Sequence, residues 1–104
     1  MEAKVSILHK DYPARVRAQV ERKLEHLERF SDRIMSVRVV LERQHDDHRV
    51  EIVVRVARGA VLVVDSREGK LSAALEESVQ RMERLLKRLH TKRIQTRRRP
   101  RAAS

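Results

Sequence analysis

Hydrophobic residues recur along the chain with two different periods, and each change of period marks a new element. Near the N-terminus, Val5 and Ile7 alternate with polar neighbours, which predicts a short strand over residues 3–9. The apolar residues that follow are spaced by four, four and three positions, which is one face of a helix over residues 13–30. This stripe consists of Val16, Val20, Leu24 and Leu27.

The period becomes two in the middle of the chain, where valines alternate with polar residues. Three segments show this pattern and each predicts a strand, namely IMSVRVVLER, RVEIVVRVAR and AVLVVDS. The polar run QHDDH separates the first two segments, and Gly59 separates the second from the third. Since connections this short join neighbouring strands, we expect the three strands to run antiparallel.

Helical spacing returns near Lys70 and is expected to continue to about residue 93. The apolar stripe of this second helix consists of Leu71, Ala74 or Leu75, Val79, Met82, Leu86 and Leu89. The residues that follow show no apolar period and include Pro100. We therefore expect one domain over residues 1–93, followed by a basic, disordered tail over residues 94–104.

The order strand, helix, three strands, helix predicts an α+β fold of two layers, in which two helices pack on one face of a four-stranded sheet. The first two strands should be parallel, because a helix crosses over between them. The uncovered face of the sheet would carry Arg38, Val40, Val53, Arg55, Val61 and Val63. Its valines fit either ordinary β propensity or a surface that contacts another protein.

Positive charge is concentrated in the last third of the chain. The net charge is +10, of which residues 1–65 contribute +2 and residues 66–104 contribute +8. A basic segment of this kind attracts polyanions, with nucleic acid as the first candidate and an anionic membrane surface as the second. Tyr12 and Phe30 are the only aromatic rings, so RNA binding would depend on phosphates and shape rather than on base stacking.

The basic residues of the second helix are regularly spaced. Arg81, Arg84, Arg88 and Lys92 are separated by three, four and four positions, so their side chains should form one ridge beside the apolar stripe. Glu83 is the only acid after Glu77, whereas a merely solvated face usually mixes both signs. We interpret the ridge, extended by Lys87, as a polyanion-binding surface. The run RRRPR at residues 97–101 would add phosphate contacts as a flexible arm.

Signals of catalysis or metal binding are sparse. The run HDDH at residues 45–48 offers two imidazoles and two carboxylates, but a polar hairpin loop explains it without a metal. The sequence shows no Gly-rich phosphate loop and no Ser-His-Asp arrangement, so we expect neither enzyme activity nor a cofactor. The absence of cysteine, of a long apolar run and of a signal-peptide pattern favours a cytoplasmic location.

The segment KLEHLERFSDRIMSVRVVLE, from Lys23 to Glu42, combines a helix lysine, a Leu-Glu pair, an aromatic residue, Asp-Arg-Ile and a Val-rich strand. In these features, and over nearly the whole of residues 1–93, the sequence resembles the ribosome hibernation-promoting factors, which include ribosome-associated inhibitor A. The segment LSAALEESVQRMERLLKRLHTK is similar to the family's second helix, with its spaced basic residues. Arg17 and Lys23 match basic positions of the first helix.

The resemblance implies a β-α-β-β-β-α fold akin to double-stranded RNA-binding domains. It also implies binding to the small ribosomal subunit and its rRNA, in the channel used by mRNA and by the A- and P-site tRNAs. A protein bound there would block initiation and store the ribosome in an inactive state under stress. The residues expected to contact RNA are Lys23, Arg81, Arg84, Lys87, Arg88, Lys92, Arg93, Arg97, Arg98 and Arg99.

A protein-interaction module is the alternative function. In that case the valine-bearing face of the sheet forms a homodimer, the basic end only aids solubility, and the protein does not bind ribosomes. Neither hypothesis involves a membrane or a small-molecule substrate, and a weak homodimer is compatible with both. Salt-dependent co-sedimentation with ribosomes separates the two hypotheses.

Overall fold

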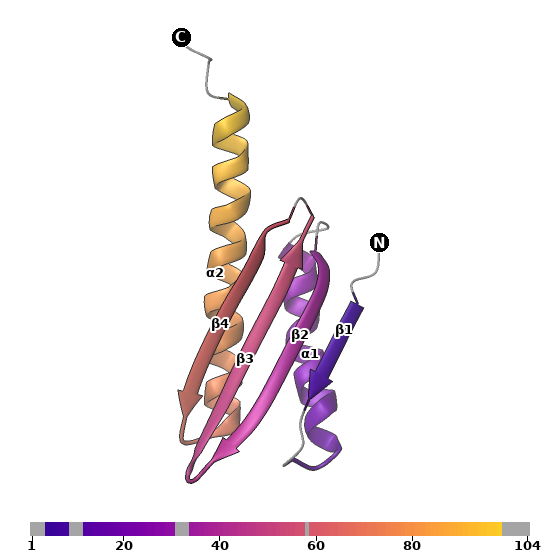
Figure 1. The fold of residues 1–104 in the computed structure, drawn as a ribbon, viewed down its shortest axis with the longest axis vertical. Helices are drawn as coiled ribbons and strands as arrows, with labels where there is room; N and C mark the ends of the chain where they lie inside the picture. Colours follow the sequence, from indigo (N-terminus) through magenta and orange to yellow (C-terminus); the bar gives the residue numbers. More distant parts are fainter. Residues whose placement is uncertain (1–3, 9–11, 31–33, 58, 99–104) are drawn as a thin grey trace.

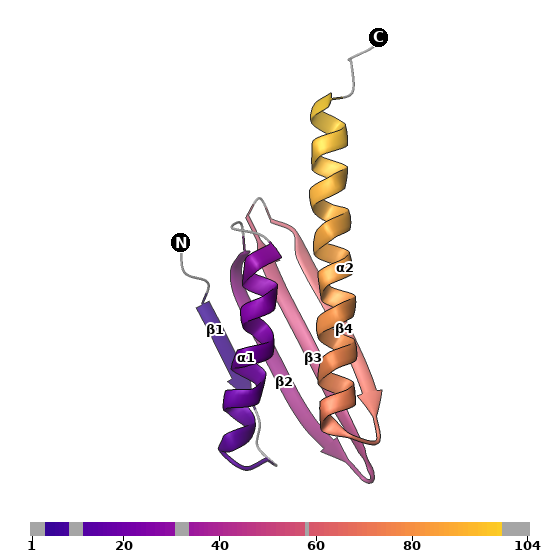
Figure 2. The same cartoon turned by 180° about the vertical axis from the view of Figure 1, so that it is seen from behind.

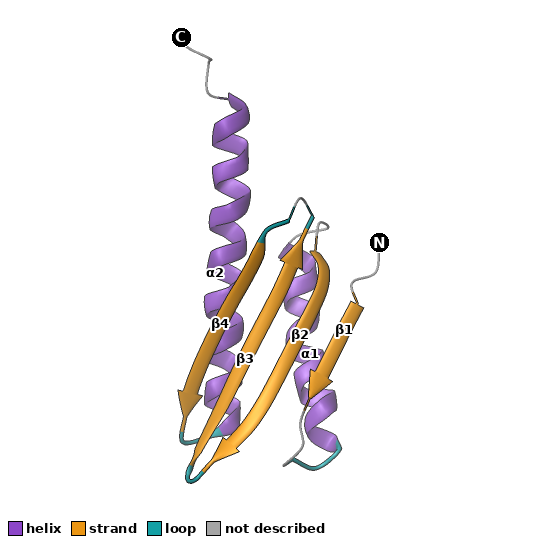
Figure 3. Cartoon of the chain, in the orientation of Figure 1, coloured by secondary structure: helices purple, strands orange, loops and turns teal. Residues whose placement is uncertain are grey.

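Six elements make up the part of the chain that the computed structural model describes, residues 4–8, 12–30, 34–57 and 59–98. They are β1 (Lys4–Leu8), α1 (Arg15–Phe30), β2 (Ile34–Gln44), β3 (Asp47–Val56), β4 (Val61–Glu68) and α2 (Leu71–Arg98), as Figure 3 shows. The predicted α+β class and the order of the elements are confirmed.

The strands form a single sheet in the order β1-β2-β3-β4. β2, β3 and β4 are long and antiparallel, whereas the short β1 pairs in parallel with β2 at one edge. A parallel pair needs a long crossover connection, and α1 provides it. The antiparallel pairs are joined by short hairpins, as the sequence predicts.

Both hairpin turns contain a residue in the left-handed region of backbone conformation. Between β2 and β3 the turn consists of His45 and Asp46, and His45 has a φ of 55°. Between β3 and β4, Gly59 has a φ of 87°, which glycine adopts without steric cost. The amide of Val56 donates a hydrogen bond of 2.9 Å to the carbonyl of Ala60 and closes this second turn.

Both helices cover the same face of the sheet, as Figures 1 and 2 show from opposite sides. The predicted stripe of α1 is buried, and it meets the stripe of α2 and one face of β2, β3 and β4 in a single apolar cluster. The buried residues of the strands alternate with exposed ones, as period two requires. The buried residues contributed by the helices are Val16, Val20, Leu24, Leu27, Ala74, Leu75, Ser78, Val79, Met82 and Leu86.

The other face of the sheet has no helix over it. Val61 and Val63 on β4 are 50% and 55% exposed, and Arg38 and Arg55 are exposed beside them. A register irregularity at the start of β2 interrupts the alternation and leaves Met35 52% exposed, between the buried Ile34 and the half-buried Ser36. The predicted uncovered face therefore exists, with apolar side chains in contact with solvent.

α2 is longer than the sequence pattern indicates. The predicted end near residue 93 is wrong, because the helix continues to Arg98. Residues 94–98 contain neither glycine nor proline, so the ladder of backbone hydrogen bonds can continue without an apolar stripe. Pro100 disfavours a helical conformation for the residue before it, which agrees with an end at Arg98. The rest of the predicted tail, residues 99–104, lies outside the described residues.

The last turns of α2 extend beyond the end of the sheet (Figure 1). This part of the helix contains Lys92, Arg93, Arg97 and Arg98. Despite its length, α2 is too highly charged to be a membrane span, and no other helix in the described ranges is long and apolar enough either.

Candidate nucleic-acid interface

Arg84 and Arg88 are two exposed positions of the predicted ridge on α2. They lie one turn apart on the side of the helix that faces away from the core residues Met82 and Leu86, and not directly beside the apolar stripe as the spacing predicts. Neither side chain makes a hydrogen bond or an ion pair with another residue of the described ranges. Two guanidinium groups that are exposed and not paired in this way are available to bind phosphate oxygens.

Arg81, at the start of the ridge, is turned toward the sheet. Its Nη1 donates a hydrogen bond of 2.9 Å to the main-chain carbonyl of Asp65 on β4, and lies 3.5 Å from the Ser66 hydroxyl. The side chain thus connects the middle of α2 to the outer strand of the sheet. Its guanidinium group is still exposed, so Arg81 has a structural contact as well as a surface available to RNA.

Lys87 lies on a different side of α2 from the ridge. It follows Glu76 by eleven residues, which is three full turns and about 20°. Because Glu76 lines the hollow between the two helices, Lys87 continues that side of α2 rather than the side of Arg81. Lys87 is exposed. The basic surface of α2 therefore wraps around the helix, from the β4 side to the α1 side.

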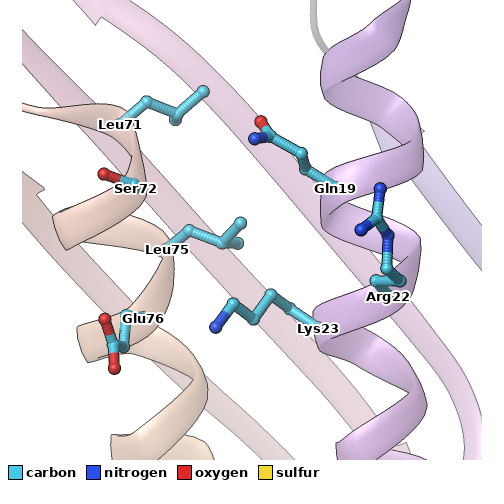
Figure 4. A pocket seen from close by; sticks show the side chains of 7 residues that line it. All are labelled: Gln19, Arg22, Lys23, Leu71, Ser72, Leu75 and Glu76. Carbon is cyan, nitrogen blue, oxygen red and sulfur yellow. The ribbon is translucent and has the colours of Figure 1, made fainter.

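Lys23 lies on α1, apart from the ridge, at a hollow between α1 and the first turns of α2 (Figure 4). The hollow has a volume of about 210 Å³. Its α1 wall contains Gln19 and Arg22 besides Lys23, which are spaced so that all three lie on one side of the helix. Its α2 wall consists of Leu71, Ser72, Leu75 and Glu76.

The structure does not bring Lys23 and Arg81 together, although the sequence groups them in one set of RNA contacts. Glu76, which belongs to the α2 wall of the hollow, and Arg81 are five residues apart, or about 140° around α2. The candidate interface therefore has two parts, the ridge of Arg84 and Arg88 and the hollow with Lys23. Arg22 belongs to the second part and is absent from the predicted contacts, because acidic residues of α1 dilute its signal in the sequence.

The remaining predicted contacts are in the last turns of α2 or beyond them. Lys92, Arg93, Arg97 and Arg98 belong to the helical segment that extends past the sheet. Their backbone continues the axis of the ridge for more than one turn, so the basic residues follow a single rod. Arg99 lies outside the described residues.

A separate cluster of charges on the uncovered face of the sheet is internally paired. Arg49 of β3 contacts Glu42, Glu51 and Asp65 at 3.2, 3.0 and 2.7 Å, so one guanidinium group links β2, β3 and β4. The hydrogen bond to Asp65 is the main cause of a raised pKa for Arg49, and partial burial opposes it. These carboxylates neutralise Arg49 and repel RNA, which excludes this end of the face from a phosphate-binding role.

The HDDH run is divided between the turn and β3. His45 and Asp46 form the exposed turn, whereas His48 lies on β3, where its Nδ1 is 2.8 Å from the Tyr12 hydroxyl. This contact connects the segment before α1 to the sheet. Within the described ranges, no three His, Asp or Glu side chains gather as metal ligands. The polar hairpin that the sequence favours agrees with this arrangement.

Comparison with known proteins identifies the family. The sequence model of the family described as sigma 54 modulation protein / S30EA ribosomal protein matches residues 4–94, which is most of the chain. The chain belongs to this family. This is the ribosome hibernation family that the sequence resembles, so the resemblance is confirmed. Its members are ribosome-associated factors. No curated protein matches the sequence.

Two solved structures have the same fold. The crystal structure of the N-terminal domain of Thermus thermophilus Protein Y aligns with a TM-score of 0.72 at 30% identity, over 86% of this chain and 99% of that one. A ribosomal subunit interface protein from Coxiella burnetii aligns with a TM-score of 0.71 at 15% identity, over 88% and 99% of the two chains. The second likeness shows the fold alone, whereas the first agrees with the family as well.

Proposed function

We propose that this protein binds the rRNA of the small ribosomal subunit, in the channel used by mRNA and by the A- and P-site tRNAs. A protein in that channel excludes mRNA and tRNA, so translation is inhibited and the ribosome is held inactive. The protein acts in the cytoplasm as a binding factor and not as an enzyme. Family membership supports an association with the ribosome, and the position within it is the further step of the proposal.

The observation that carries this proposal is the pair Arg84 and Arg88. Both guanidinium groups are exposed on a helix whose opposite side is fixed in the core, and no described residue pairs with them. Positioned cations of this kind neutralise RNA phosphates and release counterions, which supplies a large share of the affinity in protein–nucleic acid complexes. The fold presents them without any rearrangement.

Charge reversal at these two positions tests the proposal. The double variant Arg84→Glu/Arg88→Glu replaces two attractive contacts by repulsive ones, which should weaken binding to purified small subunits by well over tenfold, since about 1.4 kcal/mol corresponds to each factor of ten. The wild type should co-sediment with small subunits and inhibit cell-free translation, and the variant should do both much less. The fold should survive, because both side chains are exposed.

The uncovered sheet face offers a matched control. Arg38 and Arg55 are exposed there and alternate with the buried residues that the helices cover, and Arg38→Glu/Arg55→Glu changes the net charge by the same amount. This control should keep binding and inhibition close to those of the wild type, apart from a small loss of long-range attraction. If a folded ridge variant binds as well as the control, the ridge is not the interface and the proposal fails.

The exposed valines of the uncovered face favour a second candidate function, contact with another copy of the protein. Val61 and Val63 lie at one end of this face near Arg55, while Glu42 and Glu51 lie toward the other end. Two copies packed face to face with strands reversed would place opposite charges near each other and valines between them. Sedimentation equilibrium should then show a weak dimer that the variant Val63→Arg abolishes, and a monomer at all concentrations would refute this candidate.

A further inference from the structure

The hollow between α1 and α2 has the size of a single ring. Its volume is about 210 Å³, while an engineered cavity of roughly 150 Å³ already accommodates benzene. Pockets for drug-sized ligands and cofactors begin at about 300 Å³. An RNA duplex cannot enter such a space, but one base that has left its helix can. The size of the hollow thus favours a single heterocycle over a larger ligand.

The chemistry of the walls differs from one side of the hollow to the other. Arg22 and Lys23 bring two positive charges from α1, and Glu76 brings one negative charge from α2 (Figure 4). No ion pair joins these residues in the described part of the chain. The Lys23 ammonium points into the hollow (Figure 4), whereas the Glu76 carboxylate lies at its rim and accepts a hydrogen bond of 3.5 Å from Gln80 through Oε1. Leu71 and Leu75 form an apolar wall between them.

We propose that this hollow binds one unpaired nucleotide of the RNA, with its phosphate at Arg22 and Lys23 and its base against Leu71 and Leu75. The proposal rests on the function proposed above, because RNA brings the nucleotide to the helices. Arginine and lysine are the usual phosphate ligands. A base that is paired in a duplex stays stacked and does not reach a hollow between helices, so recognition is limited to a bulged or looped-out nucleotide.

Glu76 gives the hollow a means of distinguishing bases. A carboxylate only accepts hydrogen bonds, and cytosine offers it an exocyclic amino group. Uracil has a carbonyl oxygen at the same position, so in the same pose two acceptors would face each other, and its N3–H donor reaches the carboxylate only if the base shifts. The hollow therefore prefers cytidine to uridine. This selectivity needs no aromatic ring, which agrees with the near absence of aromatic residues.

The test measures binding to RNA hairpins by fluorescence anisotropy at one salt concentration. The hairpins share one stem and contain a bulged cytidine, a bulged uridine or no bulge. The cytidine bulge should bind about tenfold tighter than the fully paired hairpin and about fivefold tighter than the uridine bulge, which is the effect of one phosphate contact and one hydrogen bond. Equal affinity for all three hairpins overturns the proposal.

Two substitutions on α2 test whether Glu76 is the residue that distinguishes cytidine from uridine. Glu76→Ala should remove the preference for cytidine over uridine, whereas Glu83→Ala, which removes the same charge two turns away, should keep it. Glu76 is exposed and alanine favours helices, so the variant should fold. A cytidine preference that persists in Glu76→Ala contradicts the assignment.

A substitution on α1 tests the phosphate contact. Lys23→Ala should reduce the advantage of bulged over paired hairpins, and Arg15→Ala, an exposed position of α1 outside the hollow, should not. An equal effect of both substitutions overturns the phosphate contact. If the hollow binds no nucleotide, the wild type still co-sediments with small subunits. If the proposed function is wrong, the wild type does not co-sediment with them, so the two outcomes are distinguishable.

Discussion

Arg81 on α2 donates a hydrogen bond of 2.9 Å to the main-chain carbonyl of Asp65 on β4. A residue that the sequence assigns only to RNA binding therefore also holds a helix against the sheet. The carboxylate of Asp65 in turn forms an ion pair with Arg49 of β3, so α2, β4 and β3 are connected at one point. The ridge thus begins at a side chain that stabilises the fold and that we propose to contact RNA as well.

Arg81→Ala should accordingly lower stability as well as RNA affinity. Loss of the hydrogen bond should reduce the free energy of unfolding by about 1 kcal/mol, less than a buried charged hydrogen bond because the contact is exposed. Arg84 makes no such contact, so the free energy of unfolding of Arg84→Ala should stay within about 0.5 kcal/mol of the wild-type value. Urea unfolding of the two variants measures the difference. Equal stabilities would show that the bond to Asp65 does not support the fold.

The salt dependence of RNA binding should identify the phosphate contacts one by one. Each contact that is lost should lower the slope of log affinity against log salt concentration by about 1. Arg84→Ala and Arg88→Ala should each show this decrease in a titration with small-subunit rRNA, whereas Arg55→Ala should not. A decrease for Arg55→Ala alone would place the RNA on the uncovered face of the sheet.

The carboxyl groups of Glu68 and Glu77 should make stability depend on pH. A hydrogen bond with Glu77 and then repulsion by its charge raise the pKa of Glu68 above its ordinary value. The folded state thus holds the proton more tightly than the unfolded state, so the resulting stabilisation is present below the ordinary pKa and is lost as the pH rises through the raised one.

Glu77→Gln should remove most of this effect. The gain in the free energy of unfolding over the wild type should be larger at pH 7 than at pH 4, because the repulsion between the two carboxylates exists only when both are ionised. Chemical denaturation across this pH range measures the difference, and Glu76→Gln on the neighbouring position serves as the control. A difference that is constant with pH would contradict the coupling of Glu68 and Glu77.

The turn between β2 and β3 should respond selectively to substitution at His45. Its φ of 55° lies in the left-handed region, which glycine adopts freely and β-branched residues avoid. His45→Val should therefore destabilise the protein by about 1–2 kcal/mol, and His45→Gly should not destabilise it. Thermal unfolding of both variants measures this contrast. If valine is tolerated as well as glycine, the turn has a different conformation in solution.

The positions of helices and strands follow from the sequence because hydrophobic periodicity is local. The four-residue steps of α1 from Val16 to Leu27 require only that one side of a helix be buried, and this side is buried in the structure. The same holds for the ridge, since three- and four-residue spacing places Arg84 and Arg88 one turn apart whatever surrounds the helix. The end of α2 was less predictable, because residues 94–98 form a helix without an apolar stripe.

The composition of the candidate site depended instead on how the helices pack. The hydrophobic period does not determine which side of α2 faces α1 and which faces β4. In the structure, Arg81 lies on the β4 side, whereas Lys23 lines a hollow on the α1 side together with Arg22 and Glu76. The sequence by itself determined the fold class, the core stripes and the existence of a basic ridge, since each rests on contacts between near neighbours. Only the tertiary structure decided the hollow between the helices and the second role of Arg81, because both require residues far apart in the chain to meet.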